Sequence, residues 1–350
     1  MQKLTLYSLN ALVILTPLLV FNFLASCSDH ESKTISSSVV TSVRRDADWK
    51  APDTSLIPQN SEGDLIRYGR DIIVNTCLYF GPHGRISTKA NGMNCQNCHL
   101  EAGTKAWGNN YGGVYSTYPK FRERRGAIET IYQRINDCFQ RSLNGAQLDT
   151  NCREIKAIYA YMKWLGQNVE KGKKPKGCGI QQLGFLDRPA DPEKGKIVYK
   201  SVCMRCHGNS GQGTLKPDSL SYLYPPLWGP HSYSTGAGLY RLSRFAGYVH
   251  DNMPFGTSHY AAQLKNEDAW DVAAFVNSQP RPVKIIKIDW PDISLKPVDH
   301  PLGPYADSFS ELQHKYGPYG PIQKAKELKA GLLISSTKTD KESKGSKTSR

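Results

Sequence analysis

The sequence lacks the patterns that would assign it to several large protein classes. It has no glycine-rich phosphate-binding loop and no nucleic-acid-binding motif, so its net charge of +14 does not predict a nucleic-acid partner. Its longest apolar run, 11–25, is interrupted by Pro17 and Asn22 and falls short of the roughly 20 residues that a membrane-spanning helix needs. With 350 residues the chain is long enough for two hydrophobic cores. Its 39% hydrophobic and 22% charged side chains are typical of a soluble globular protein. The excess of basic residues favours an anionic substrate or partner.

The apolar run near the start predicts an export signal. Lys3 precedes it, and it ends in Leu-Ala-Ser-Cys27, which resembles a bacterial lipobox. We expect residues 1–26 to be removed and Cys27 to be lipidated, which would hold the protein at a membrane surface. Ser28 follows where an Asp typically retains a lipoprotein at the inner membrane, so we expect the periplasmic side of the outer membrane. The alternative is an ordinary secretory signal with a chance cysteine.

Two C-x-x-C-H motifs carry the strongest functional signal: Cys95-Gln-Asn-Cys98-His99 and Cys203-Met-Arg-Cys206-His207. Two thiols at this spacing reach the two vinyl groups of a porphyrin, and the next residue places an imidazole under the iron. A zinc site or a redox dithiol is the alternative. Two copies on an exported chain predict two covalently bound haem c groups, with His99 and His207 as proximal ligands.

The chain divides into two similar halves, so we predict an all-α fold of two tandem cytochrome c-type domains. In each half a glycine-containing helix (62–76, 191–202) leads into the motif, and an aromatic-bearing helix (152–166, 266–277) ends the domain. We expect these segments: a flexible tether (27–55), domain 1 with the catalytic haem (56–178), a linker (172–188), domain 2 with the electron-transfer haem (188–280), an irregular C-terminal extension that wraps over the domains (281–320) and a charged disordered tail (321–350).

A sixth iron ligand for the second haem is expected in Asn252-Met253-Pro254-Phe255-Gly256. Pro254 ends a helix, so the thioether of Met253 would hang from a loop over the iron. With only five methionines in the chain, we predict His207/Met253 ligation, which gives a relatively high potential. His250 is the alternative ligand, and Met253 could instead be a core residue.

The first half has no methionine at the matching place and has Cys138 there instead. Arg134, Cys138 and Ser142 are spaced i, i+4, i+8 and so share one stripe of a helix. A basic segment, 120–125, lies just upstream, and such a positive field favours the thiolate form of a cysteine. The alternatives for Cys138 are a buried free cysteine or a disulfide partner.

Three further cysteines, Cys77, Cys152 and Cys178, allow one disulfide and one free thiol, and the sequence does not choose between the three pairings.

The sequence resembles the dihaem cytochromes of the thiosulfate dehydrogenase (TsdA) family over about residues 60–320. The resemblance rests on NCQNCHL at 94–100, RINDCFQRSLNG at 134–145, the second C-x-x-C-H motif and the N-M-P-x-G element. It implies that thiosulfate is oxidised to tetrathionate, or the reverse, at a haem ligated by His99 and Cys138. It also implies that a haem ligated by His207 and Met253 passes the electrons to a redox partner such as a soluble cytochrome or a terminal oxidase.

The family pattern further implies roles for individual residues. Arg124, Arg134 and Ser142 would hold the anion, and Cys138 would leave the iron and carry a sulfonate-bearing sulfur as a covalent intermediate. Some members have a lysine before the methionine that can exchange with it as ligand, and this sequence departs from them with Asn252.

A function from another class competes with this interpretation. The protein could be a non-catalytic dihaem electron-transfer lipoprotein in which Cys138 only tunes the haem potential. Tetrathionate reduction and sulfur-carrier processing, as in related Sox-type cytochromes, are further alternatives. Arginines around Cys138 favour the enzyme, because joining two dianions requires cationic hydrogen-bond donors.

Overall fold

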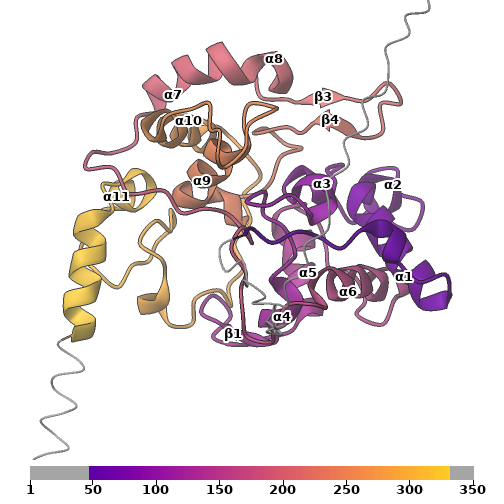
Figure 1. Cartoon of the computed structure of the whole chain (residues 1–350). Coiled ribbons are helices and arrows are strands. Elements are labelled where there is room, and N and C mark those ends of the chain that lie inside the picture. Colours follow the sequence, from indigo (N-terminus) through magenta and orange to yellow (C-terminus); the bar gives the residue numbers. More distant parts are fainter. Residues whose placement is uncertain (1–46, 332–350) are drawn as a thin grey trace, which may run out of the picture. The chain divides into compact units, whose positions relative to one another are not determined.

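The computed structural model describes residues 47–331, which are largely helical, as the sequence predicts (Figure 1). The elements of domain 1 are η1 (Thr54–Leu56), α1 (Ser61–Val74), α2 (Thr76–Phe80), η2 (Cys95–Asn97), α3 (Leu100–Gly103), α4 (Val114–Thr117), β1 (Lys120–Arg122), β2 (Ala127–Glu129), α5 (Ile131–Arg141) and α6 (Arg153–Gly166).

Domain 2 has a similar order of elements, with a shorter first helix. Its elements are α7 (Pro192–Val198), the π-helical turn η3 (Tyr199–Cys203), α8 (Met204–His207), β3 (Thr214–Leu215), β4 (Tyr222–Tyr224), η4 (Gly238–Tyr240), α9 (Leu242–Asn252) and α10 (Asn266–Ser278). The strands form two antiparallel pairs, β1 with β2 and β3 with β4, and they leave the all-α class unchanged.

In both domains the first helix crosses the last one at a glycine. A Cβ added to Gly69 of α1 would lie 1.9 Å from the carbonyl oxygen of Ala157 in α6. One added to Gly195 of α7 would lie 1.8 Å from the carbonyl oxygen of Asp271 in α10. Only glycine permits this approach. In Figure 1, α1 lies against α6 and α7 against α10, and a haem motif follows α1 and α7 in the chain.

The structure corrects the tether prediction in its last residues. Asp48 accepts hydrogen bonds from the indole of Trp107 (3.0 Å) and the hydroxyl of Tyr260 (2.9 Å). The backbone N–H of Trp49 donates to the carbonyl of Lys176 at 2.8 Å. The hydrophilic composition suggested a loose segment, but these partners come from distant parts of the chain. The signal segment, Cys27 and the rest of the tether lie outside the described residues.

The C-terminal extension is mostly irregular and carries only η5 (Ile293–Leu295) and α11 (Glu311–Tyr316) between residues 281 and 319. Residues 320–331, however, are helical, which corrects the prediction that disorder begins at 321. Ile322 is buried, and Lys326 donates through Nζ to the carbonyl of Lys296 at 2.7 Å. Packing therefore outweighs the charged composition there. Residues 332–350 lie outside the described part of the chain.

Among residues 47–331 no cysteine forms a disulfide, so the pairing that Cys77, Cys152 and Cys178 would allow is not made. The buried thiol of Cys77 donates to the carbonyl of Leu220 in domain 2 at 2.6 Å instead. Within the same residues no helix is long and apolar enough to cross a membrane.

The domains contact each other close to the first haem motif. The hydroxyl of Tyr248 in α9 donates to the carbonyl of Asn97, inside C-x-x-C-H, at 3.1 Å. The amide of Asn252 donates to the carbonyl of Trp107 at 3.2 Å, and the Trp107 ring stacks on His259 at 4.1 Å between ring centroids. Domain 2 thus helps to fix the loop that surrounds the first site.

Candidate active site

One ring nitrogen of His99 forms a hydrogen bond, and the other is left available as a metal ligand. Its Nδ1 lies 2.5 Å from the carbonyl oxygen of Asn109, and because a carbonyl only accepts, Nδ1 carries the proton and Nε2 has a free lone pair. Burial lowers the pKa of His99 to about 4, so the ring is neutral. Tyr111 stacks on the ring at 4.5 Å. A neutral, oriented imidazole with a free Nε2 is what a metal ligand requires.

His207 is prepared in the same way in domain 2. Its Nδ1 lies 2.8 Å from the carbonyl oxygen of Pro225, and burial lowers its pKa. Met253 ends α9 and packs, partly buried, against the core. His250, the alternative ligand, places its Nδ1 2.8 Å from the carboxylate of Asp251. Met253 as sixth ligand remains a prediction.

Helix α5 presents Cys138 to the first site. Thr130 and Gln133 begin the helix with a capping box, in which each side chain binds the other residue's backbone N–H. Ile135 and Phe139 are buried and fix the rotation of the helix. Ser142 ends it, donating its N–H to the carbonyl of Cys138 at 2.9 Å.

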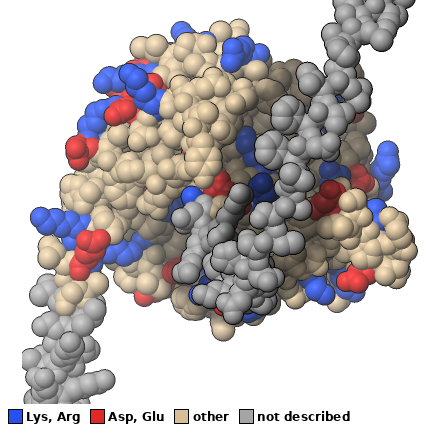
Figure 2. Space-filling model, viewed as in Figure 1, with Lys and Arg blue, Asp and Glu red and all other residues tan. Residues whose placement is uncertain are grey.

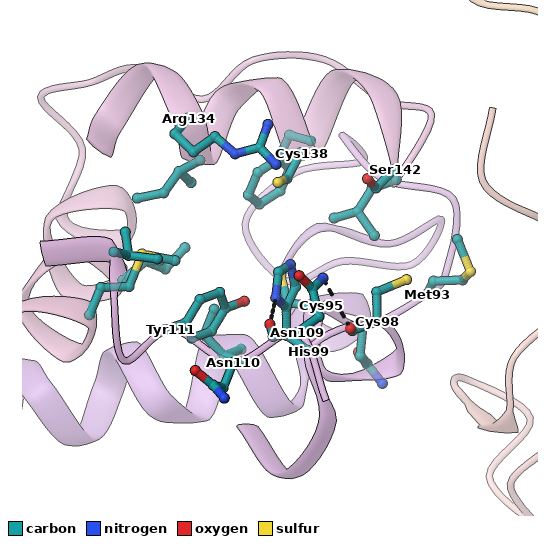
Figure 3. A pocket seen from close by; sticks show the side chains of 18 of the residues that line it. Met93, Cys95, Cys98, His99, Asn109, Asn110, Tyr111, Arg134, Cys138 and Ser142 are labelled. Carbon is teal, nitrogen blue, oxygen red and sulfur yellow. Dashed lines mark hydrogen bonds between the residues drawn. The ribbon is translucent and has the colours of Figure 1, made fainter. Parts of the chain in front are cut away.

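Arg134, Cys138 and Ser142 line one cavity together with Cys95, Cys98 and His99. Figure 3 shows Cys138 on α5 facing His99 across this cavity, with the guanidinium of Arg134 directed toward the thiol. The cavity, called the inner cavity below, holds about 870 Å³ free of protein atoms, the open space at its mouth included. The structure therefore brings together the side chains that the sequence predicts for the first haem, apart from Arg124.

Met93 and Met162 also line the inner cavity. Figure 3 places Met93 to the side, beside Cys98, whereas Cys138 lies opposite His99. This arrangement favours Cys138 over Met93 as the group that faces the iron.

The electrostatics couple Arg134 to Cys138. The charge of Cys138 is the largest cause that raises the pKa of Arg134, and it outweighs the opposing effect of burial. No salt bridge within the described residues joins Arg134 to a carboxylate, so its charge is available to a substrate.

An outer cavity extends from the inner one and contains about 1610 Å³ of free space, open solvent included. Among residues 47–331, its lining has one acidic residue, Asp137, and eight basic ones: Lys120, Arg122, Arg124, Arg134, Arg141, Lys174, Arg241 and Arg244. Figure 2 shows basic and acidic side chains interspersed over the face in view. The outer cavity, in contrast, has a positive excess suited to anions.

Arg124 does not reach the inner cavity. Its Nη1 donates to the carbonyl of Gly236 at 3.0 Å, and its guanidinium lies 5.6 Å from the ring centre of Trp290. Burial, followed by the charge of Arg141, lowers the pKa of Arg124 to about 10, so it stays cationic at neutral pH. It can therefore attract an anion into the outer cavity, which it lines, but it is not placed beside Cys138.

The sequence did not indicate which cations are neutralised or which distant residues join the site. Arg141 flanks the α5 stripe but is bound by Asp289 of the extension, with Nη1 at 2.6 Å from Oδ2 and Nη2 at 2.8 Å from Oδ1. Arg244 and Lys174 line the outer cavity from α9 and the linker, and no local pattern connects them to Cys138.

The residues of both motifs fit covalently attached haem. Cys95 and Cys98 would hold the first group through thioether bonds, with the Nε2 of His99 toward the iron; Cys203, Cys206 and His207 would do the same in domain 2. The inner cavity has mainly apolar walls, as a porphyrin requires, and α5 contributes Arg134, Cys138 and Ser142 to one side of it.

Comparisons with known proteins agree with this geometry. Residues 86–170 match the family model "SoxA/TsdA, cytochrome c domain", and residues 192–280 match "Cytochrome c". The chain is therefore a c-type cytochrome of two haem domains, with two covalently bound haem c groups.

Similar proteins show which family of c-type cytochromes the chain belongs to. A thiosulfate dehydrogenase of Allochromatium vinosum is 39% identical over 236 residues, which cover 66% of this chain and 84% of that protein. One from Psychrobacter arcticus is 35% identical, covering 69% and 72%. The solved structure of thiosulfate dehydrogenase (TsdBA) from Marichromatium purpuratum has a TM-score of 0.61 and 30% identity over 67% of this chain, and it is matched over half of its own length. The chain belongs to the thiosulfate dehydrogenase family.

Proposed function

We propose that this protein oxidises thiosulfate to tetrathionate, in a reaction that can also run in reverse. The observation that carries the proposal is the position of Cys138: its thiol faces His99 across the inner cavity, beside Arg134, at the inner end of a cavity lined by eight Lys and Arg. A plain electron carrier has no need for an anion-binding cavity that leads to a thiol.

The overall change joins two thiosulfate dianions through a new S–S bond and releases two electrons. When bound, the two haems supply the electron acceptors, one electron each. Arg134 and Ser142 would hold a sulfonate by charge and hydrogen bonding. Cys138 would carry one sulfane sulfur as a covalent adduct, from which the second thiosulfate displaces the Cys138 thiolate while forming tetrathionate.

The proposal is tested with the purified dihaem protein. Thiosulfate should reduce ferricyanide in its presence, with tetrathionate as the identified product. Absence of turnover with both thiosulfate and tetrathionate would leave the non-catalytic carrier as the function.

We propose further that Cys27 is lipidated and anchors the protein on the periplasmic side of the outer membrane, from where electrons pass to a redox partner such as a soluble cytochrome or a terminal oxidase. The Leu-Ala-Ser-Cys27 sequence and the following Ser28 support this location. Cys27→Ser should release the protein from the membrane fraction or leave it unprocessed, as seen by fractionation and mass. A mutant of unchanged mass that stays in the membrane fraction would contradict the anchor.

A further inference from the structure

The basic residues of the outer cavity fall into two groups. Three are neutralised by carboxylates, in the ion pairs Arg122–Glu129 (3.5 Å), Arg141–Asp289 (2.6 Å) and Arg241–Asp299 (2.5 Å). The other five form no salt bridge within residues 47–331: Arg124, Arg134, Lys120, Lys174 and Arg244.

Two of these five basic residues come from different domains. Arg134 lies on α5 of domain 1 beside Cys138, and Arg244 lies on α9 of domain 2. Arg244 stands in the first turn of α9, where the helix dipole disfavours a cation. Within the described residues it makes no hydrogen bond or salt bridge. The nearby Asp299 is already bound by Arg241 and by the backbone N–H of Ser243 (3.2 Å).

The surroundings of Arg244 make its charge costly. Burial, followed by the charges of Arg241, Arg134 and Arg122, lowers the pKa of Arg244 to about 10, against the opposing effect of Asp299. Burial and the charge of Arg244 lower the pKa of Lys174 in turn. Cations that repel one another and form no salt bridge within residues 47–331 are stabilised when an anion binds between them.

Lys120 extends this group toward Cys138. Its ammonium lies 4.7 Å from the ring centre of Tyr118, a residue that also lines the inner cavity. Burial lowers its pKa, as do the neighbouring charges of Arg122, Arg134 and Lys174. Unpaired positive charge therefore continues from Arg134 to the domain 2 side of the outer cavity.

We propose that Arg244, with Lys120 and Lys174, forms a second sulfonate subsite, which holds the end of the substrate that is remote from Cys138. This inference rests on the proposed function. Tetrathionate carries a sulfonate at each end, and its formation from two thiosulfates requires both anions in the site at once. Arg134 and Ser142 bind one sulfonate, and Arg244 with Lys120 and Lys174 binds the other. Because Arg244 belongs to domain 2, the complete site requires both domains.

Two inert probes separate the subsites: ethanesulfonate, with one sulfonate, and ethane-1,2-disulfonate, with two sulfonates joined through two atoms as in tetrathionate. Their dissociation constants for the dihaem protein are measured by calorimetry at constant ionic strength. The wild-type protein should bind the disulfonate about tenfold or more tightly than the monosulfonate. Arg244→Gln should abolish most of this advantage while changing ethanesulfonate binding by less than about twofold.

Matched variants show whether the effect is specific. Arg85→Gln removes the same charge from an exposed position outside both cavities and should keep the full advantage of the disulfonate. Lys174→Gln should lose part of it. The haem spectra of all variants should match the wild type, which checks that they fold, and Arg244→Gln should reduce kcat/KM for tetrathionate about tenfold.

The outcomes distinguish the two proposals. If the wild-type protein binds both probes equally, or if Arg244→Gln keeps the advantage of the disulfonate, the second subsite is wrong and the proposed function is untouched. If neither probe binds and thiosulfate is not turned over, the proposed function fails, and the subsite fails with it.

Discussion

In both domains a histidine offers its Nδ1 proton to a backbone carbonyl, His99 to Asn109 and His207 to Pro225, but what accompanies the two histidines differs. Opposite His99 stands a thiol beside an arginine, in a cavity that opens toward further cations. In domain 2 the expected counterpart is Met253, a neutral thioether at the end of α9. The same helical scaffold thus combines an anion-binding redox site with one suited to electron transfer. The potential of a haem depends strongly on its axial ligands, so electrons should flow from the first site to the second.

The strongest test of this comparison is to make the first site resemble the second. Cys138→Met should keep both haems, because methionine fills the space and binds iron. Thiosulfate turnover should fall by about three orders of magnitude or more, since the nucleophile is gone. The potential of the first haem should rise, because a thioether stabilises ferric iron less than a thiolate does. Steady-state kinetics and a redox titration measure both effects.

Cys152→Ser is the control for that variant. Cys152 precedes α6 outside both cavities, and serine is a good residue at a helix start, so activity and potential should stay at wild-type values. Wild-type turnover in Cys138→Met would refute the catalytic role, and a wild-type thiolate signal in its electron spin resonance would refute the ligand role.

The helix crossing that both domains share can be disrupted at Gly69 and Gly195. Gly69→Ala and Gly195→Ala should each destabilise their own domain by about 2–3 kcal/mol, because the new Cβ would overlap a carbonyl oxygen of the crossing helix. Denaturant unfolding followed by circular dichroism measures the change. Gly184→Ala, where a Cβ meets nothing within 4 Å, is the control and should be near neutral. A neutral Gly69→Ala would show that the helices do not cross this closely.

The second site is tested at its expected ligand. Met253→Gly should remove the sulfur-to-iron absorption at the red end of the oxidised spectrum and lower the potential of that haem by on the order of 0.1 V, with both haems still attached. The parallel variant His250→Gln should leave the absorption in place. If the absorption survives in Met253→Gly, another residue is the ligand.

A smaller effect should separate binding from ligation at the first site. Arg134→Lys replaces a bidentate fork by a point charge, so KM for thiosulfate should rise about tenfold while the haem spectrum barely changes. Arg153→Lys, whose guanidinium lies over Tyr68 outside both cavities, should leave KM unchanged. An unchanged KM in Arg134→Lys would place the sulfonate elsewhere.

Sequence reasoning failed where distant segments decide the outcome. Residues 47–55 read as a tether and 321–331 as a disordered tail, because both are rich in polar and charged side chains. Trp49 is nevertheless held by Lys176, and Ile322 is buried in the core. The composition of a short segment does not indicate whether residues far away in the sequence will bind or bury it.

What the sequence determined by itself is local in origin. The spacing within C-x-x-C-H places two thiols and an imidazole together, and the helical period puts Arg134, Cys138 and Ser142 on one stripe of α5. What only the tertiary structure decided is the charge that acts on that stripe. Asp289 neutralises Arg141, and Arg124 is bound to the carbonyl of Gly236. Arg244 joins from the other domain and forms no salt bridge in the described part of the chain. The physical reason is that charges interact through space, so the net field at Cys138 depends on distances that only the folded chain defines.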